Sequence, residues 1–261
     1  SSNFVNSLFD QDGQIWVGTE TGGITKLAPR LLQLEFYQND PRNPGSIARN
    51  AVNAMFPAPD GTLWVGVVEG GLNALSPHSK NFVHYTTANS GLPHNSVSTL
   101  AADGHGNLWI GTWGGGVAVM PLREPGKMQR LLVGDRYQEL VSFVGAFAYD
   151  AINDGMWIGT NDGLFFYDIK KRQLEEPFPH CLDIRGCIGS LVTRDGKLLM
   201  GCIQGMVEVD LRSRRGARRN FAVTYHSYKL DNPKSGVFDK ILSFCQTKDG
   251  KIWMGSNGYG M

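Results

Sequence analysis

The sequence lacks several features that would assign it to a common functional class. Its 261 residues carry a formal net charge of +1, with 19% charged residues. Proteins that hold nucleic acid through bulk charge show a basic excess, so we expect no direct nucleic-acid binding by this region. The sequence also has no run of about 18 apolar residues, so it predicts no membrane-spanning helix.

Cysteine is scarce, and its spacing is uninformative. The four cysteines are Cys181, Cys187, Cys202 and Cys245, and no two have the Cys-x-x-Cys spacing of a zinc or redox site. They are too few for a scaffold built on disulfides, and small buried residues are the expected role. A Cys181–Cys187 bridge stays open if the compartment is oxidising.

The familiar catalytic motifs are missing as well. The sequence has no phosphate-binding loop, no His-Glu-x-x-His and no Gly-x-Ser-x-Gly. Residues 111–116 are glycine-rich but join two predicted strands, which is not the context of a dinucleotide site. The Asp-Gly turns lack the Asp-x-Asp-x-Asp spacing of a calcium loop. We therefore expect no enzyme activity, no metal and no cofactor in this region.

Glycine, in contrast, is abundant. The 33 glycines are about twice the usual share of roughly 7%. They follow no Gly-X-Y register, which excludes a collagen, and many tight turns explain them better. One phrase returns along the chain: a glycine two or three residues before a tryptophan, then an apolar residue and a second glycine, as in Gly-x-Leu/Ile-Trp-Ile/Val-Gly. Its copies are residues 13–19, 61–66, 106–112, 155–160, a degraded copy at 196–201 with Leu199 in the tryptophan place, and 250–255.

The repeat has the period of a β-propeller blade. The steps between tryptophan places are 48, 45, 48, 42 and 54 residues, and blades of four strands repeat at about 40–50. Each unit begins with a short apolar run, then an Asp-Gly type turn, which is a strong hairpin signal. The sequence therefore predicts an all-β chain of four-stranded antiparallel blades, about five and a half in number, as a fragment of a larger ring.

We expect one propeller domain over 1–261, as a piece of a longer protein. The predicted blade units are 3–50, 51–96, 97–142, 143–186, 187–239 and the incomplete 240–261. Central blade strands are buried on both faces. The repeated tryptophans are therefore expected in blade cores, each beside a glycine that leaves room for a neighbouring side chain. They are Trp16, Trp64, Trp109, Trp157 and Trp253.

The phrase, the period and the connections together resemble a known repeat. Segments 43–52 and 90–97 are similar to the Ser-Leu-x-x-Asn-x-Val and Gly-Leu-x-x-Asn-x-Val entries to a blade in the two-component regulator propeller family. That family is typical of the periplasmic sensor regions of hybrid two-component systems in gut Bacteroidetes. The fifth unit departs from the pattern at residues 199–202, so its blade is expected to be irregular.

The resemblance implies a function. It implies a periplasmic region of an inner-membrane sensor histidine kinase that recognises oligosaccharides from glycans and controls transcription of polysaccharide-utilisation genes. The partners it implies are an oligosaccharide, the rest of the sensor chain and, as an open arrangement, a second copy in a homodimer. A cyclic-nucleotide synthase as the output domain also stays open.

A ligand is expected on one face of the blades, because loops between second and third strands emerge beside the connections between blades. Amphipathic rings, amides and carboxylates there would suit a sugar. The candidate residues are Arg49, Asn50, Glu69, His94, Asn95, Trp113, Asp162, Gln204, Asn257 and Tyr259. Further members of the same loops are Glu20, Arg42, Arg136, Asn161, His180 and Lys240.

Two other readings stay open. One is a propeller lyase similar to streptogramin-inactivating enzymes, which use a metal and a histidine; only His94 and His180 are expected on the right face. The other is a scaffold that binds protein and no small ligand. An arginine run between the third and fourth strands of the fifth unit, at Arg212, Arg214, Arg215, Arg218 and Arg219, is expected to be a solvated hairpin tip.

Overall fold

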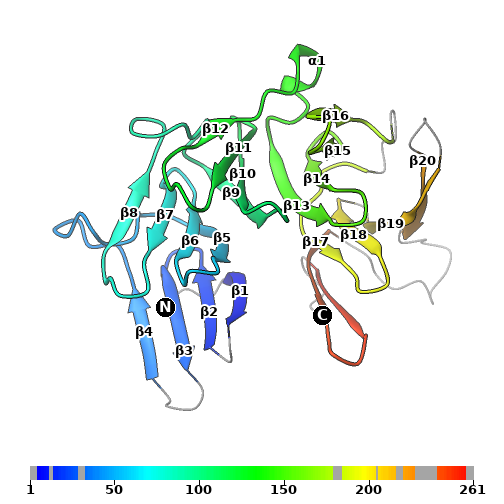
Figure 1. The fold of residues 1–261 in the computed structure, drawn as a ribbon. Helices are drawn as coiled ribbons and strands as arrows, with labels where there is room; N and C mark the ends of the chain where they lie inside the picture. Colours follow the sequence, from blue (N-terminus) through cyan, green and yellow to red (C-terminus); the bar gives the residue numbers. More distant parts are fainter. Residues whose placement is uncertain are drawn as a thin grey trace. The chain divides into compact units, whose positions relative to one another are not determined.

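The computed structural model describes residues 5–11, 14–28, 33–178, 184–203, 205–215, 220–226 and 240–256. Within them the chain is almost entirely β-structure, and five four-stranded sheets follow one another (Figure 1). Each sheet is an antiparallel meander whose strands neighbour each other in chain order. The predicted fold class, a series of propeller blades with a sixth begun, is confirmed.

The strands of the N-terminal half form blades 1 to 3. Blade 1 contains β1 (Val5–Gln11), β2 (Gln14–Thr19), β3 (Ile24–Ala28) and β4 (Gln33–Tyr37). Blade 2 contains β5 (Val52–Pro57), β6 (Leu63–Val67), β7 (Gly71–Leu75) and β8 (Phe82–Tyr85). Blade 3 contains β9 (Val97–Ala102), β10 (Asn107–Thr112), β11 (Val117–Pro121) and β12 (Gln129–Arg130).

The remaining strands form blades 4 and 5 and the start of blade 6. Blade 4 contains β13 (Val144–Asp150), β14 (Gly155–Thr160), β15 (Leu164–Asp168) and β16 (Gln173–Glu175). Blade 5 contains β17 (Ser190–Val192), β18 (Lys197–Cys202), β19 (Gly205–Arg215) and β20 (Asn220–His226). Blade 6 has β21 (Ile241–Gln246) and β22 (Ile252–Ser256).

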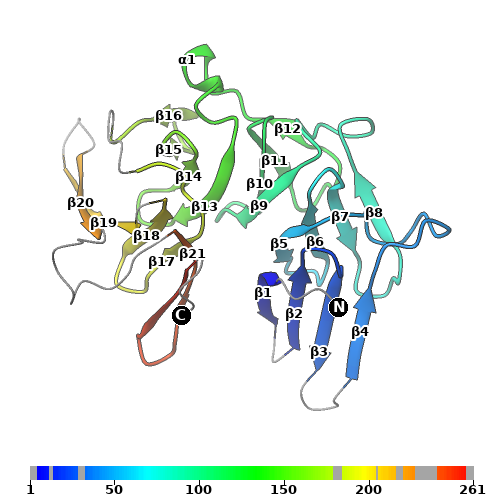
Figure 2. The ribbon, with the colours of Figure 1, turned by 180° about the vertical axis from the view of Figure 1, so that it is seen from behind.

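The chain packs as two compact units. The N-terminal unit comprises Ser1–Ala102 and Gly106–Leu131, and the C-terminal unit comprises Asp103–His105 and Leu132–Met261. Within each unit the first strands of consecutive blades contact each other, as β1 does with β5 (Figure 2), β5 with β9, and β13 with β17. The assignment of 1–261 to a single propeller domain stays a prediction.

Three of the Asp-Gly turns have the backbone conformation that their composition predicts, whereas in Asp154–Gly155 it is the aspartate that has a positive φ, of 52°. Gly61, Gly196 and Gly250 have φ of 86°, 83° and 90°, in the left-handed region that favours glycine. Asp60 Oδ1 also accepts the backbone N–H of Thr62 at 3.0 Å, which fixes the turn from the side. The predicted turn at residues 12–13 lies outside the described residues.

Blade packing explains why glycine follows the tryptophan. A Cβ added to Gly66 would stand 2.6 Å from Val97 Cγ1, and one added to Gly18 would stand 2.8 Å from Val52 Cγ1. Both valines belong to the first strand of the next blade. The glycine therefore receives a neighbour's side chain, as the sequence predicts.

The repeated tryptophans are core residues at four of five places. Trp16, Trp64, Trp109 and Trp157 are 6%, 2%, 2% and 0% exposed. Trp253 has the same register in its hairpin, opposite Cys245, but is 51% exposed. Its predicted burial is wrong, because among the described residues β22 pairs only with β21, so the tryptophan has no third strand beside it.

The fifth unit is less irregular than expected. Leu199, in the tryptophan place, is 3% exposed within a complete four-stranded sheet. The irregularity lies at each end of the blade instead. The first strand is β17, two residues shorter than the apolar run 188–192, because Gly189 has a φ of 74°. The register also shifts between Asp210 and Arg215 in β19.

Three further findings concern a short helix, membrane-spanning segments and the arginine run. A helix of four residues, α1 (Asp135–Gln138), follows blade 3. No helix in the described part of the chain is long and apolar enough to cross a membrane. Of the predicted arginine run, Arg212 is exposed and lies in β19 with Arg214 and Arg215, whereas residues 218–219 lie outside the described residues.

The cysteines divide into buried and exposed. Cys187 and Cys202 are buried free thiols whose Sγ atoms lie 3.7 Å apart, and Cys245 is exposed, against expectation. The hydrogen bond with Cys202 and then burial raise the pKa of the Cys187 thiol well above its ordinary value, so it stays protonated. Cys181 lies outside the described residues, and the free thiol of Cys187 is against the Cys181–Cys187 bridge that the sequence left open.

Candidate functional site

In blades 1, 3 and 4 the loop after the tryptophan strand is closed by the threonine that ends the repeated phrase. In blade 3, Thr112 Oγ1 donates to the carbonyl of Gly116 at 2.8 Å and accepts the N–H of Gly115 at 3.2 Å. Thr19 and Thr160 make the same pair of bonds in blades 1 and 4. Each threonine therefore holds a short loop in one shape without help from the loop's own side chains.

The connection that enters a blade lies beside the loop of the same blade. The N–H of Trp113 donates to the carbonyl of Ser96 at 2.9 Å, and the N–H of Val68 donates to the carbonyl of Ala51 at 3.0 Å. In the N-terminal unit a further bond, from the N–H of Glu69 to Ser96 Oγ at 3.2 Å, brings the β6–β7 loop to the β8–β9 connection, which already holds the β10–β11 loop. We call this region the loop face of the N-terminal unit, defined by residues 49–50, 69, 94–96 and 113.

Ser96 is the centre of the loop face. Its side chain, in a residue only 3% exposed, donates a short hydrogen bond to Glu69 Oε1 and accepts the N–H of Glu69 at 3.2 Å. Its own N–H donates to His94 Nδ1 at 3.0 Å. One buried serine from blade 3 therefore fixes the Glu69 carboxylate of blade 2 and the ring of His94.

These bonds decide what His94 offers to a ligand. Because Nδ1 accepts a hydrogen bond, the neutral ring carries its proton on Nε2, which can donate. The ring packs on the glycines of the blade 3 loop: a Cβ on Gly114 would stand 3.6 Å from Nε2, and one on Gly115 would stand 2.8 Å from the His94 Cβ. Glycine suits both positions, since Gly114 has a φ of 114° and a Cβ on Gly115 would also stand 2.7 Å from the backbone of Pro93.

Trp113 is the aromatic member of the loop face. It is 41% exposed, although Thr112 before it is fully buried. The threonine turn and the bond to Ser96 fix its backbone, so the indole is presented on a rigid support. An exposed ring on a fixed backbone loses little conformational entropy when a ligand stacks on it.

The two asparagines of the prediction have structural partners. Asn50, with a φ of 96°, donates from Nδ2 to the carbonyl of Val68 at 3.1 Å. Asn95 accepts the N–H of Thr87 on Oδ1 at 2.9 Å, while its carbonyl accepts the N–H of Gly71 at 2.8 Å. Both asparagines tie a connection to a loop. Arg49 is exposed next to Asn50, on the same connection.

The other predicted residues are placed elsewhere or lie outside the description. Asp162 belongs to the C-terminal unit, where it is exposed and its N–H donates to Thr160 Oγ1 at 3.1 Å. Arg136, also in that unit, lies 3.8 Å from Glu176 and over the ring of Tyr137. His180, Gln204, Asn257 and Tyr259 lie outside the described residues. The structure thus brings together Glu69, His94 and Trp113, with Arg49, Asn50 and Asn95 around them.

The sequence interpretation missed Ser96. A lone serine before a strand matches no motif, and the corresponding residue in blade 2 is Ala51. The signal available was its place in the entry segment 90–97, between an asparagine and the first strand. The described residues contain no group of three or more histidine, cysteine, aspartate or glutamate side chains that could hold a metal ion.

The loop face can therefore supply a carboxylate acceptor, an imidazole donor and an exposed indole, held by buried hydrogen bonds. The fold and this face define a β-propeller with a polar, aromatic loop surface. Residues 91–114 and 235–258 match the model of the two component regulator propeller. These two segments match the repeat that the sequence resembles, which confirms the resemblance.

Solved structures share the fold. The extracellular domain of the hybrid two component system BT3049 from B. thetaiotaomicron has a TM-score of 0.80 and 21% identity, over 98% of this chain and 32% of that one. The corresponding domain of BT4673 from the same organism has a TM-score of 0.77 and 20% identity, over 97% of this chain and 31% of that one. The chain thus spans about a third of the length of each.

A third relative by fold has a different described role. PorZ, a surface component of the type-IX secretion system of Porphyromonas gingivalis, has a TM-score of 0.68 and 16% identity, over 99% of this chain and 40% of that one. Similarities at this level show the fold alone. No curated protein matched the chain.

Proposed function

We propose that this chain is an extracytoplasmic, ligand-sensing propeller of a membrane-bound hybrid two-component system, and that its loop face binds an oligosaccharide. The observation that supports binding there is the Ser96 network, which holds Glu69 and His94 beside the exposed Trp113. The repeats at 91–114 and 235–258 and the fold shared with two extracellular sensor domains support the sensor role.

The chemistry of the loop face suits a sugar. A pyranose has an apolar face that packs on an indole and hydroxyls that both donate and accept. Glu69 would accept from one hydroxyl, and His94 Nε2–H would donate to another. Because both groups are already oriented by Ser96, binding would cost little side-chain entropy. These three residues lie in one unit, so the proposal requires no contribution from the other.

Signalling follows if the ligand has different affinities for two states of the sensor. In the proposal, the region is periplasmic, and binding changes the geometry of the propeller or of a homodimer. The change reaches a histidine kinase across the membrane, which controls transcription of polysaccharide-utilisation genes. The rest of the sensor chain is the partner that this step requires.

The binding step is tested with a panel of plant, host and microbial oligosaccharides, titrated into the 261-residue chain by isothermal titration calorimetry. We expect at least one to bind, and Trp113→Ala to weaken that ligand about tenfold or more, since it removes both the apolar area that the indole buries and a stacking contribution of about 0.5–1.5 kcal/mol. Trp253→Phe, which changes an exposed tryptophan of the other unit, is the control. If the hits bind equally to Trp113→Ala and wild type, the loop face is not the site.

A further inference from the structure

A cavity lies between blades 1 and 2, at the end of their strands that is opposite the loop face. It has a volume of about 470 Å³, within the range of small-ligand pockets. Blade 1 contributes residues of β2, β3 and β4, and blade 2 contributes Gly61 and the β7–β8 hairpin. In an antiparallel meander these hairpins lie opposite the β6–β7 loop that carries Glu69, so the cavity is separate from the loop face.

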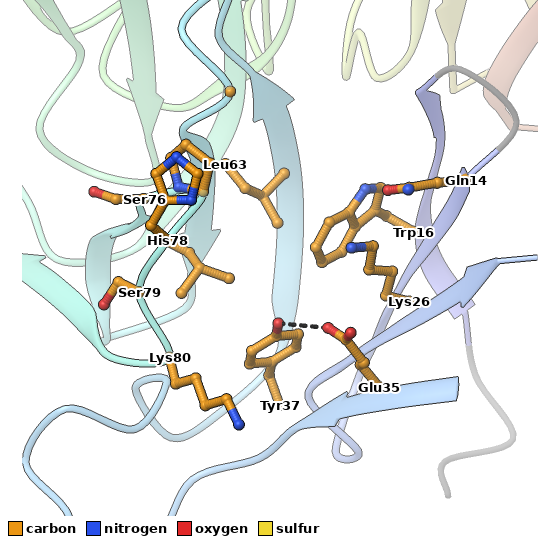
Figure 3. Close-up of a pocket in the computed structure, with 13 residues that line it drawn as sticks. Gln14, Trp16, Lys26, Glu35, Tyr37, Leu63, Ser76, His78, Ser79 and Lys80 are labelled. Atoms are coloured by element: carbon orange, nitrogen blue, oxygen red, sulfur yellow. Dashed lines mark hydrogen bonds between the residues drawn. The ribbon is translucent and has the colours of Figure 1, made fainter. Parts of the chain in front are cut away.

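Strand register explains how blade 1 lines this cavity. Trp16 of β2 pairs with Lys26 of β3, and Lys26 pairs with Glu35 of β4. Directly opposed residues of neighbouring strands share a face, so these three side chains form one row towards blade 2. Tyr37, two residues after Glu35, lies on the same face. Figure 3 shows the row on one side of the pocket, with Leu63 and His78 of blade 2 on the other.

Aromatic and aliphatic side chains that pack on one another form part of the cavity wall. Trp16 is 6% exposed and stacks on Tyr37, with ring centroids 6.2 Å apart and planes at 28°. Tyr37 in turn meets Phe82 edge-on at 5.7 Å. Leu63 and Leu75 pair across blade 2 and are both buried. A flat or ring-shaped molecule can therefore pack against a surface that is already in place.

The charges of the cavity favour an anion. The lining contains two lysines and a histidine but a single carboxylate, Glu35. Lys26 Nζ lies 5.1 Å from the centroid of the Trp16 ring, which holds the ammonium at the wall. Glu35 already accepts a hydrogen bond from the Tyr37 hydroxyl at 2.9 Å. Burial, and then this bond, raise the pKa of Tyr37 to about 12, so it remains a neutral donor.

We propose that this cavity binds a small cyclic carboxylate, with its ring against Trp16 and Leu63 and its carboxylate on Lys26. A charge-assisted bond from Lys26 would supply the anchor. Two kinds of molecule have this chemistry, sugar acids and aromatic acids. The free acceptor capacity of Glu35 distinguishes them, because only a sugar acid has hydroxyls to donate to it.

The test uses the 261-residue chain and four probes, titrated by NMR through the backbone amides of Gln14, Lys26 and Ser76. D-glucuronate and benzoate are the acids, and D-glucose and benzyl alcohol are their neutral counterparts. We expect at least one acid to bind with a Kd of about 1 mM or lower, and its neutral counterpart to bind at least about tenfold more weakly.

Variants assign the anchor. Lys26→Gln should weaken the acid about tenfold or more, whereas Lys127→Gln, a lysine of the blade 3 hairpin paired with Glu124, should leave it unchanged. Glu35→Gln should weaken glucuronate more than benzoate if the ligand is a sugar acid, and equally if it is an aromatic acid. Thermal melting of each variant verifies that it is folded. If a variant does not fold, the wild-type titration with the four probes still tests the proposal.

The proposal is overturned if the acids bind no better than the neutral probes, if none of the four binds, or if folded Lys26→Gln binds like wild type. It does not depend on the proposed function of the loop face. Trp113→Ala should leave binding of the acid unchanged, so failure at one site is distinguishable from failure at the other.

Discussion

At the residue scale, the tryptophan position of the repeat has different surroundings in different blades. Trp157 is fully buried, and its Nε1–H donates to Asp150 Oδ2 at 3.3 Å. Trp64 is equally enclosed, but its Nε1 has no partner among the described residues, and Ala58 stands where blade 4 has Asp150. Trp253 is half exposed. The same sequence phrase therefore predicts the strand, but it does not predict how much its tryptophan contributes to the free energy of unfolding.

This difference predicts unequal losses of stability. Trp157→Ala should lower the free energy of unfolding by about 3–5 kcal/mol, since it leaves a cavity and removes one of the hydrogen bonds to the buried Asp150. Trp253→Ala should cost well under half of that, because its ring is half in solvent. Urea denaturation of both variants measures the comparison. Equal losses would mean that Trp253 is as buried in solution as Trp157.

Ser96 is the residue on which the loop face depends. Ser96→Ala removes the hydroxyl that bonds Glu69, and should cost about 1–3 kcal/mol in the free energy of unfolding. It should also release the Glu69 carboxylate and weaken any oligosaccharide that binds wild type. Ser98→Ala, a buried serine in the next strand, controls for loss of a hydroxyl alone. An unchanged affinity in Ser96→Ala would show that Glu69 needs no positioning.

A third residue-scale prediction concerns pH. His105 Nε2 lies 2.7 Å from Asp154 Oδ1, and this hydrogen bond, with the charge of Asp154, raises the pKa of His105 above 6.5. The interaction therefore stabilises the fold fully below pH 6.5 and is lost as pH rises through the folded pKa. His105→Gln should lower Tm at about pH 5.5 and have little effect at about pH 8.5. His78→Gln is the control, and a pH-independent difference for His105→Gln would contradict the assignment.

At the element scale, blades are joined through glycine. The glycine two residues after the tryptophan leaves space beside its strand. The first strand of the next blade places a valine in this space, as at Gly66 and Val97. In blades 1, 3 and 4 a threonine turn then closes the adjoining loop. The repeated phrase thus contains both the packing contact between blades and the support of the loop that carries a functional residue.

Gly66→Ala should consequently destabilise the chain by about 1–3 kcal/mol through overpacking against Val97. Adding Val97→Ala to Gly66→Ala should recover part of this loss, because the smaller side chain at 97 makes room for the new Cβ. If the two residues were not in contact, Val97→Ala would only leave a cavity and lower the stability further. Gly106→Ala is the control for backbone strain, since its φ is 82° and its added Cβ would meet nothing within 4 Å. If the double variant is as unstable as the sum of the single ones, the two residues do not pack as described.

At the scale of the whole chain, the sequence predicted those features of the fold that local chemistry determines. Period, Asp-Gly turns and apolar runs are local, so strands and blades could be read from them. The Ser96 network joins three loops through one serine that belongs to no motif. The wall of the cavity between blades 1 and 2 depends on the register of blade 1 and on its packing against blade 2. The exposure of Trp253 depends on what covers β22. None of these has a local signature.

The central claim is that the loop face of the N-terminal unit binds the ligand of a sensor. Hydrogen–deuterium exchange of the 261-residue chain, with and without a saturating oligosaccharide from the panel, tests it most directly. We predict slower exchange of the amides at 68–71, 94–97 and 113–116, whose backbones carry or adjoin Glu69, His94 and Trp113. Protection confined to other segments, with these amides unchanged, would contradict the account.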